Sequence, residues 1–215
     1  MGKNLLTAHT LYLRELEKAV GTDCETLLDI GCGSDSPIKF FSERFHAVGI
    51  DAHIPSLEKS MKKGIHDKYF NMTFSELDEF ESCAFDCVIA LDVVEHIRKD
   101  EGLRLLDNME RIAKKKIVVV TPNGFLPSGA YDNNPWQIHR SGWTTKEMRM
   151  RGYKVIGIIG LKTLRGERAI LRFNPKPLWE IVSTLTQYIV RNHPEFAFEI
   201  LCIKSKARVL QSGFE

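Results

Sequence analysis

The chain has 215 residues, of which 43% are hydrophobic and 27% are charged. This composition is typical of a folded domain and excludes an intrinsically disordered protein. The formal net charge of +2 lacks the strongly basic excess of a dedicated nucleic-acid binder, so no nucleic acid is expected as a partner.

Strands and helices are expected to alternate along the chain. An amphipathic helix with leucines at helical spacing ends near Gly21. Short apolar runs predict buried strands at residues 26–30, 46–50, 68–72, 85–91 and 116–120, with helical segments at 37–45, 56–63 and 100–113 between them. Asp100 is the expected N-cap of the last of these helices. The alternation predicts right-handed crossovers and a parallel sheet covered by helices on both faces.

A polar loop, a short helix and two strands follow this alternating region. The loop spans residues 124–142, the helix 144–151, and the strands 153–159 and 196–203. Residues 161–195 are expected to form a helical insert within a single domain. The insert begins with several arginines, and Pro177 opens a helix with an apolar stripe that includes Ile181 and Leu185. We expect a lid over an acceptor site or a homodimer contact; a solvated basic surface and an ordinary core helix are the alternatives.

Targeting and redox features favour a cytoplasmic protein. Residues 1–10 lack the apolar core of a signal peptide, and no apolar run is long enough to span a bilayer, so integral membrane association is not expected. The five cysteines form no CxxC pair, which is typical of reduced thiols. Cys83 and Cys87 lack a second pair with metal-ligand spacing, so no metal site is predicted.

The strongest chemical signal is the run LLDIGCG at residues 27–33. A strand that ends in Gly-x-Gly lets the backbone approach a ligand closely. Asp29 lies two residues before the first glycine, a position suited to a cationic ligand group. Asp51 ends the next strand, where a carboxylate can accept hydrogen bonds from both ribose hydroxyls. Either acid alone often only ends a strand or caps a helix, but both together with the glycine turn indicate a nucleotide-like ligand.

Three segments in this order resemble the motifs of class I S-adenosylmethionine-dependent methyltransferases. They are DIGCG at 29–33, GID at 49–51 and FDCVIALDVVEHI at 85–97. The resemblance implies a three-layer α/β Rossmann-like fold with a seven-stranded, mostly parallel sheet whose last strand is antiparallel. It also implies S-adenosyl-L-methionine as cofactor and S-adenosyl-L-homocysteine as product. The implied cofactor-binding residues are Asp29, Gly31, Cys32, Gly33, Asp35, Asp51, Ala52, Met72, Thr73, Leu91, Asp92 and Val93.

In that family the turn glycines hold the amino-acid part of the cofactor and the acid after the second strand binds ribose. Residues after the third strand flank adenine, which assigns this role to Met72 and Thr73. The chain departs from the family pattern at two points. Asp35 stands where many members have a third glycine, and no clear acid follows the third strand.

Two histidines are the candidate catalytic residues. If a helical turn follows the strand at 85–91, Asp92 and His96 share one face of it, at the sheet edge where α/β proteins bind ligands. His96 is suited to accept a proton from an acceptor; packing beneath the cofactor is the alternative, because many methyl transfers need only an aligned nucleophile. His139 lies near Trp136 in the polar loop, where substrate contact and a loop held by its own aromatic residues are equally supported.

The expected reaction is methyl transfer to an oxygen, nitrogen or carbon nucleophile of a small-molecule acceptor. A cofactor-binding protein without transferase activity, with a regulatory or scaffolding role, is the alternative outside enzymes. A nicotinamide-dependent reductase is the weaker alternative. Ser36 stands where the full dinucleotide fingerprint requires a third glycine, and no Tyr-x-x-x-Lys pair is present in the sequence.

Overall fold

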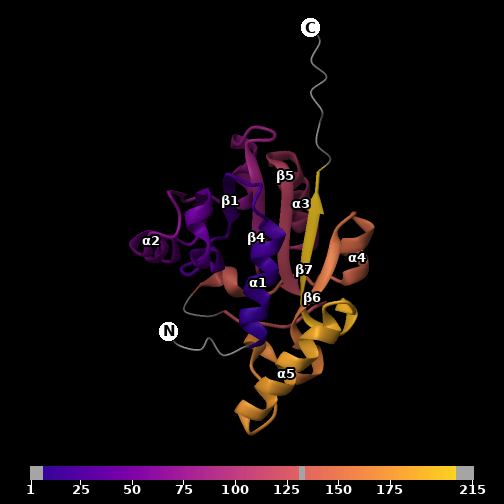
Figure 1. Cartoon of the computed structure of the whole chain (residues 1–215). Coiled ribbons are helices and arrows are strands. Elements are labelled where there is room, and N and C mark those ends of the chain that lie inside the picture. Colours follow the sequence, from indigo (N-terminus) through magenta and orange to yellow (C-terminus); the bar gives the residue numbers. More distant parts are fainter. Residues whose placement is uncertain (1–6, 131–133, 207–215) are drawn as a thin grey trace.

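The computed structural model describes residues 7–130 and 134–206, whose strands form one seven-stranded sheet (Figure 1). The strands are β1 (Thr26–Ile30), β2 (His46–Ile50), β3 (Lys68–Phe70), β4 (Phe85–Leu91), β5 (Ala113–Pro122), β6 (Lys154–Leu161) and β7 (Ala197–Ser205). Their order is β3-β2-β1-β4-β5-β7-β6. Strands β1 to β5 pair in parallel, and β7 is antiparallel to both neighbours. The predicted sheet, with its antiparallel last strand, is confirmed.

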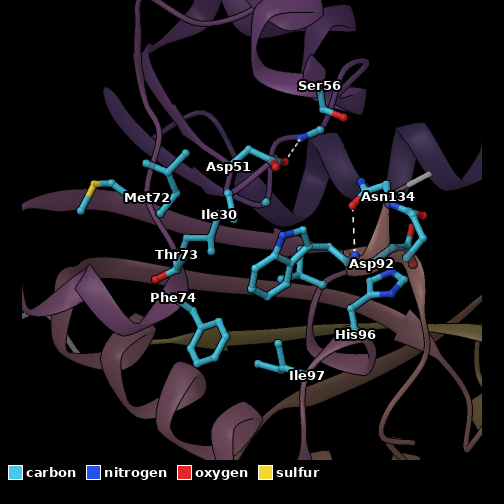
Figure 2. A pocket seen from close by; sticks show the side chains of 17 residues that line it. Ile30, Asp51, Ser56, Met72, Thr73, Phe74, Asp92, His96, Ile97 and Asn134 are labelled. Atoms are coloured by element: carbon cyan, nitrogen blue, oxygen red, sulfur yellow. Dashed lines mark hydrogen bonds between the residues drawn. The ribbon is translucent and has the colours of Figure 1, made fainter. Parts of the chain in front are cut away.

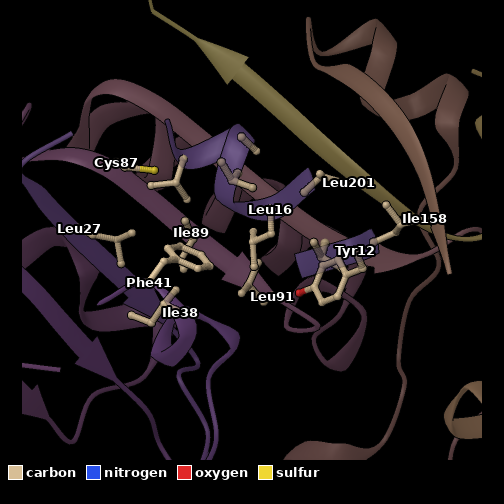
Figure 3. Packing of buried hydrophobic residues seen from close by; sticks show 14 of the residues in the cluster. Tyr12, Leu16, Leu27, Ile38, Phe41, Cys87, Ile89, Leu91, Ile158 and Leu201 are labelled. Carbon is tan, nitrogen blue, oxygen red and sulfur yellow. The ribbon is translucent and has the colours of Figure 1, made fainter. Parts of the chain in front are cut away.

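Helices cover both faces of the sheet and complete the three layers. They are α1 (Ala8–Val20), α2 (Ile54–Lys63), α3 (Lys99–Ile112), α4 (Thr145–Met150) and α5 (Lys176–Val190). On one face, α1 packs Tyr12 and Leu16 onto a cluster that includes Leu91 (Figure 3). On the other face, α3 packs Leu105 in a cluster that includes Trp143. No helix among the described residues has the length and apolarity to cross a bilayer.

The central strand β4 shows why the sequences of the buried strands are apolar on both sides. Cys87 and Ile89 belong to the cluster beneath α1, whereas Val88 and Ala90 belong to the cluster beneath α3. Successive side chains of a strand point to opposite faces, and here both faces are covered. The strand therefore carries no polar alternation, and its carboxyl end projects the next residues toward the edge of the sheet.

Two local predictions differ from the structure. Residues 37–45 form two 3-10 turns, Pro37–Phe40 and Ser42–Arg44, in place of a helix. Phe41 between them has a non-helical backbone with φ −151° and buries its ring in the core. The N-cap of α3 is Arg98, whose backbone N–H bonds to the carboxylate of Glu101, so Asp100 lies in the first turn of the helix.

The insert between β6 and β7 places the polar side of α5 against the sheet. Gln187 is 3% exposed, accepts a hydrogen bond from the Gly160 N–H and donates one to the Gly157 carbonyl. A Cβ at Gly157 would lie 2.1 Å from the Val190 carbonyl oxygen, so glycine permits this close approach. The apolar stripe faces outward instead, with side chains between 52% and 62% exposed: Leu178, Ile181, Leu185, Tyr188 and Ile189.

Because the stripe faces outward, the double variant Ile181→Ser, Leu185→Ser should keep its free energy of unfolding within about 0.5 kcal/mol. Val190→Ser is the matched control on the same helix, since Val190 is fully buried and its loss should cost about 1.5–3 kcal/mol. Urea denaturation measures both. A homodimer held by the stripe would appear in sedimentation as a dimer that the double variant converts to a folded monomer. A large stability loss in the double variant would contradict the outward orientation.

Candidate active site

A cavity opens at the carboxyl ends of β1, β2 and β4, where open α/β sheets bind ligands. It measures about 680 Å³ with the open solvent at its mouth included. Figure 2 shows Met72 and Thr73 on one side of it and His96 and Asn134 on the other. Residues assigned to the cofactor from the sequence that line it are Gly31, Gly33, Asp51, Ala52, Met72, Thr73, Asp92 and Val93.

The turn after β1 needs glycine at two positions. Gly31 has φ +67° and Gly33 has φ +58°, in the left-handed region that favours glycine. A Cβ at Gly31 would lie 2.6 Å from a methyl group of Val93, so the turn packs directly on the segment after β4. An added Cβ at Gly33 would meet no atom within 4 Å. Gly33 therefore borders open space, which leaves room for a ligand against the backbone.

Asp51 connects the end of β2 to this turn. Its Oδ2 accepts a hydrogen bond from the Gly33 N–H at 2.8 Å, and its Oδ1 accepts one from the His53 N–H at 2.7 Å. Burial raises the pKa of Asp51, while the two N–H donors oppose that rise. Each carboxylate oxygen keeps a further lone pair, so Asp51 can also accept hydrogen bonds from ligand hydroxyls.

Four of the residues assigned to the cofactor lie outside the cavity lining: Asp29, Cys32, Asp35 and Leu91. Asp29 is 1% exposed, and its Oδ2 lies 2.6 Å from the Ser36 hydroxyl and 2.9 Å from His66 Nε2. Cys32 and Leu91 are also buried, and Asp35 forms surface ion pairs with two lysines. The structure thus shows these side chains in contacts that support the turn and the core.

Residues without an assigned role complete the cavity wall. Asn134 and Gln137 come from the loop between β5 and α4, and Phe74 from the turn after β3. Trp136, which the sequence suggested for the substrate, also lines this first cavity. An aromatic residue directly after a strand end was a signal for Phe74, whereas nothing in the sequence marks Gln137.

A second cavity adjoins the first, and Asp92, His96 and Gln137 line both. Its other lining residues are Glu95, Pro122, Leu126, Ser128, His139, Glu167, Arg168, Ala169, Phe198 and Glu199. Within the described part of the chain, the insert therefore reaches this cavity through the turn at Glu167–Ala169 and not through α5.

Four carboxyl groups line this second cavity, those of Asp92, Glu95, Glu167 and Glu199. Asp92 is exposed toward both cavities, but the protein around it reduces its contact with bulk water and raises its pKa to about 6. Burial, followed by repulsion from Asp92, raises the pKa of Glu95 and of Glu199 well above the usual glutamate value. The lone acid in the apolar run FAFEILCI is the sequence signal for Glu199.

His96 and His139 lie together at the same place, with ring centroids 4.8 Å apart. His139 Nδ1 lies 2.6 Å from the carbonyl oxygen of Leu126; a carbonyl only accepts, so Nδ1 donates and Nε2 keeps the lone pair. Burial and then repulsion from His139 lower the pKa of His96 to about 4, and burial lowers the pKa of His139. Both rings are therefore neutral at pH 7. His96 is a weak proton acceptor, but both rings offer lone pairs.

The loop between β5 and α4 is fastened to the turn after β4. The N–H groups of Arg140 and Ser141 both donate to the Glu95 carbonyl, at 2.7 and 3.0 Å. The Ser141 hydroxyl and the indole N–H of Trp143 both donate to the Val94 carbonyl. Trp143 is fully buried, so an aromatic residue does hold the loop while other loop residues line the cavities.

The sequence profile of a family described as a methyltransferase domain matches residues 28–121. No curated protein matches the chain significantly. Among solved structures, a SAM-dependent methyltransferase from Archaeoglobus fulgidus is 16% identical, with 92% of this chain and 94% of that one covered and a TM-score of 0.60. Magnesium protoporphyrin IX methyltransferase from Synechocystis PCC 6803, solved with bound SAM, is 14% identical, with 93% and 80% covered and a TM-score of 0.53.

The structural likenesses establish the fold at these low identities. The profile match covers a part of the chain, residues 28–121, that includes the glycine turn, Asp51 and the segment after β4, which together line the first cavity. The space beside Gly33 and the acceptor atoms of Asp51 fit the cofactor that the family uses. Residues 28–121 are therefore similar to a methyltransferase domain, and the chain has the fold seen in S-adenosylmethionine-dependent methyltransferases.

Proposed function

We propose that the protein is an S-adenosylmethionine-dependent methyltransferase and that it acts on a small-molecule acceptor bound in the second cavity. The observation that carries the proposal is the shared lining of the two cavities by Asp92, His96 and Gln137. A cofactor in the first cavity and an acceptor in the second would meet at these residues. The second cavity measures about 360 Å³, a size that suits a small molecule.

The charge of the second cavity argues against a nucleic acid as acceptor. Asp92, Glu95 and Glu199 line it, and in their ionised form these acids repel the phosphate groups that dominate nucleic-acid binding. Arg168 and Glu167 add one charge of each sign at the insert side. The cavity therefore favours an acceptor that is neutral or positively charged near the junction.

S-adenosylmethionine supplies a methyl group bound to a positively charged sulfur. The residues of the chain would bind and orient it: Gly33 leaves space for it, and Asp51 accepts hydrogen bonds from its ribose. Asp92 lies at the junction, where an ionised carboxylate favours a positive charge nearby. Alignment of the acceptor in a site shielded from water accounts for much of the rate that such transfers need.

His96 and His139 are the proposed catalytic residues because both line the second cavity next to the junction. Each neutral ring can use its lone pair to hold or activate an acceptor atom. His139 has its lone pair on Nε2, since Nδ1 donates to Leu126. A ring that only packs beneath the cofactor would not need to line the second cavity.

Asp51→Ala should weaken the binding of S-adenosylhomocysteine by about 1–3 kcal/mol, because it removes hydrogen bonds to a charged group. Calorimetric titration measures the change. Asp35→Ala is the matched control, since Asp35 is an acid near the same turn that lies outside the lining. Unchanged affinity in Asp51→Ala would contradict the assignment of Asp51 to the ribose.

The proposal is tested with S-adenosylmethionine carrying a labelled methyl group, incubated with the protein and a cell extract split by dialysis. Label transferred to the dialysable fraction supports a small-molecule acceptor, whereas label in the retained fraction contradicts it. Ser128→Trp is the informative variant, because Ser128 lines the second cavity and not the first. It should lower transfer and leave cofactor affinity unchanged. Cofactor binding without any transfer would favour the alternative of a non-enzymatic cofactor-binding protein.

A further inference from the structure

A cluster of metal-ligating side chains lies where the two cavities meet. Glu95, His96 and His139 each offer one ligand atom, and these atoms lie within 4.8 Å of one another. Ligands of a first-row cation lie about 2.1 Å from the ion, and therefore roughly 3.4 Å from one another in tetrahedral geometry. Small side-chain rotations close the difference, so the three groups can share one ion.

Each imidazole has a feature that points to a metal ligand. Cations bind the neutral form of histidine, and a ligating ring usually donates its other N–H to a carbonyl or carboxylate. His139 does so through Nδ1 to Leu126, which leaves Nε2 for a cation. In His96, Nδ1 is buried without a hydrogen-bond partner in the described part of the chain. A buried polar atom without a partner is rare in folded proteins, and a bound ion or water is a usual reason for it.

The acidic side chains around these two rings also favour the binding of a cation. Glu95 is 2% exposed, and its Oε2 accepts a hydrogen bond from the Thr121 hydroxyl. Asp92 and Glu199 line the same cavity and repel it. Buried carboxylates are normally paired or bound to a metal. Arg165 attracts Glu199, but its guanidinium is shared with Glu180. A cation bound at Glu95 would add the positive charge that reduces the repulsion among Asp92, Glu95 and Glu199.

The two segments that supply the ligands are fixed to each other. Glu95 and His96 belong to the turn after β4, and His139 to the loop between β5 and α4. The two backbone N–H groups after His139, those of Arg140 and Ser141, bond to the Glu95 carbonyl. The backbone that carries the ligands is therefore held in place before an ion binds, which leaves only side-chain rotations to complete the site.

We propose that Glu95, His96 and His139 bind a divalent first-row transition-metal ion, with Asp92 beside it at the junction of the cavities. A ligand set of two nitrogens and a carboxylate favours such an ion over Mg²⁺ or Ca²⁺, which prefer oxygen ligands. What the ion does rests on the proposed function, because it would hold an oxygen or nitrogen atom of an acceptor in the second cavity. Whether it binds is independent of that function.

The test is calorimetric titration of the chelator-treated protein with Mn²⁺, without a polyhistidine tag, cofactor or acceptor. We expect one Mn²⁺ per chain. Glu95→Gln and His139→Gln should each weaken the affinity by at least about tenfold, the loss typical even of residues that only support a ligand. His193→Gln is the matched control, since His193 lies on the surface 3.6 Å from Glu195; it should bind Mn²⁺ as the unchanged protein does.

Two further readouts separate a ligand from a structural residue. Mn²⁺ should raise the melting temperature of the unchanged protein and of the control, but not of the two ligand variants. Co²⁺ absorption should report nitrogen ligation that His139→Gln alters. If His139→Gln does not fold, the Mn²⁺ affinity of the near-isosteric variant Glu95→Gln decides whether the site binds the ion. Failure of Mn²⁺ and Co²⁺ to bind, or equal binding in both variants, overturns the proposal. Methyl transfer is measured separately, so the two proposals can fail independently.

Discussion

Replacing His139 with alanine should lower turnover by about 10²–10⁴-fold, the usual contribution of a group that activates a reacting atom. His139 lines the second cavity but not the first, so the affinity for S-adenosylhomocysteine should stay unchanged. The loss is expected whether Nε2 accepts a proton or binds a cation, since either role needs its lone pair. Initial rates at saturating cofactor, together with calorimetric titration of the product, check the prediction.

His193→Ala is the control for the loss of a histidine, because this side chain lies on the surface beside Glu195. It should change neither the rate nor the affinity. Melting curves of both variants show whether the fold is kept. A fall in cofactor affinity equal to the fall in turnover would contradict the placement of His139 at the acceptor. Loss of folding would show that its hydrogen bond to Leu126 mainly holds the loop.

The features that the sequence predicted well depend on local rules. A strand that ends in Gly-x-Gly restricts the backbone within a few residues, and Gly31 and Gly33 do adopt positive φ values. Asp51 followed from the next strand because parallel strands end at the same edge of a sheet. Buried strands such as β4 were visible because both faces are covered, which makes the whole run apolar.

The features that were missed depend on contacts between distant segments. Asp29 turns away from the cavity because His66, 37 residues later, lies beside it. Glu95 and Glu199 line one cavity only because β7 pairs with β5, next to β4, and no local pattern reveals that neighbourhood. The orientation of the α5 stripe could not be predicted for a related reason. Its polar side contains Gln187, which satisfies backbone groups of β6, and helical periodicity alone does not say which side faces inward.

Trp143→Ala should lower the free energy of unfolding by about 3–5 kcal/mol, the usual cost of removing a buried tryptophan. Trp143 is 0% exposed, and its indole N–H donates to the Val94 carbonyl at 3.1 Å. The Lys99 ammonium lies 3.6 Å from the ring centroid. Trp136→Ala is the matched control, because Trp136 is 38% exposed; it should cost little stability, although it lines the cofactor cavity. Urea denaturation compares the two variants.

The contact between Trp143 and Gly102 of α3 makes this prediction sharper. A Cβ at Gly102 would lie 2.4 Å from the indole ring, so Gly102→Ala alone should be destabilising. In the Trp143→Ala background the ring is gone, and alanine is about 1 kcal/mol more favourable than glycine inside a helix. The same substitution should then be stabilising. The sign of the Gly102→Ala effect thus depends on the indole, and unfolding of the four proteins measures the coupling. Effects of the same sign in both backgrounds would contradict the packing of the Trp143 ring on Gly102. They would also weaken the inference that Trp143 holds the loop of His139 against the turn that contains Glu95.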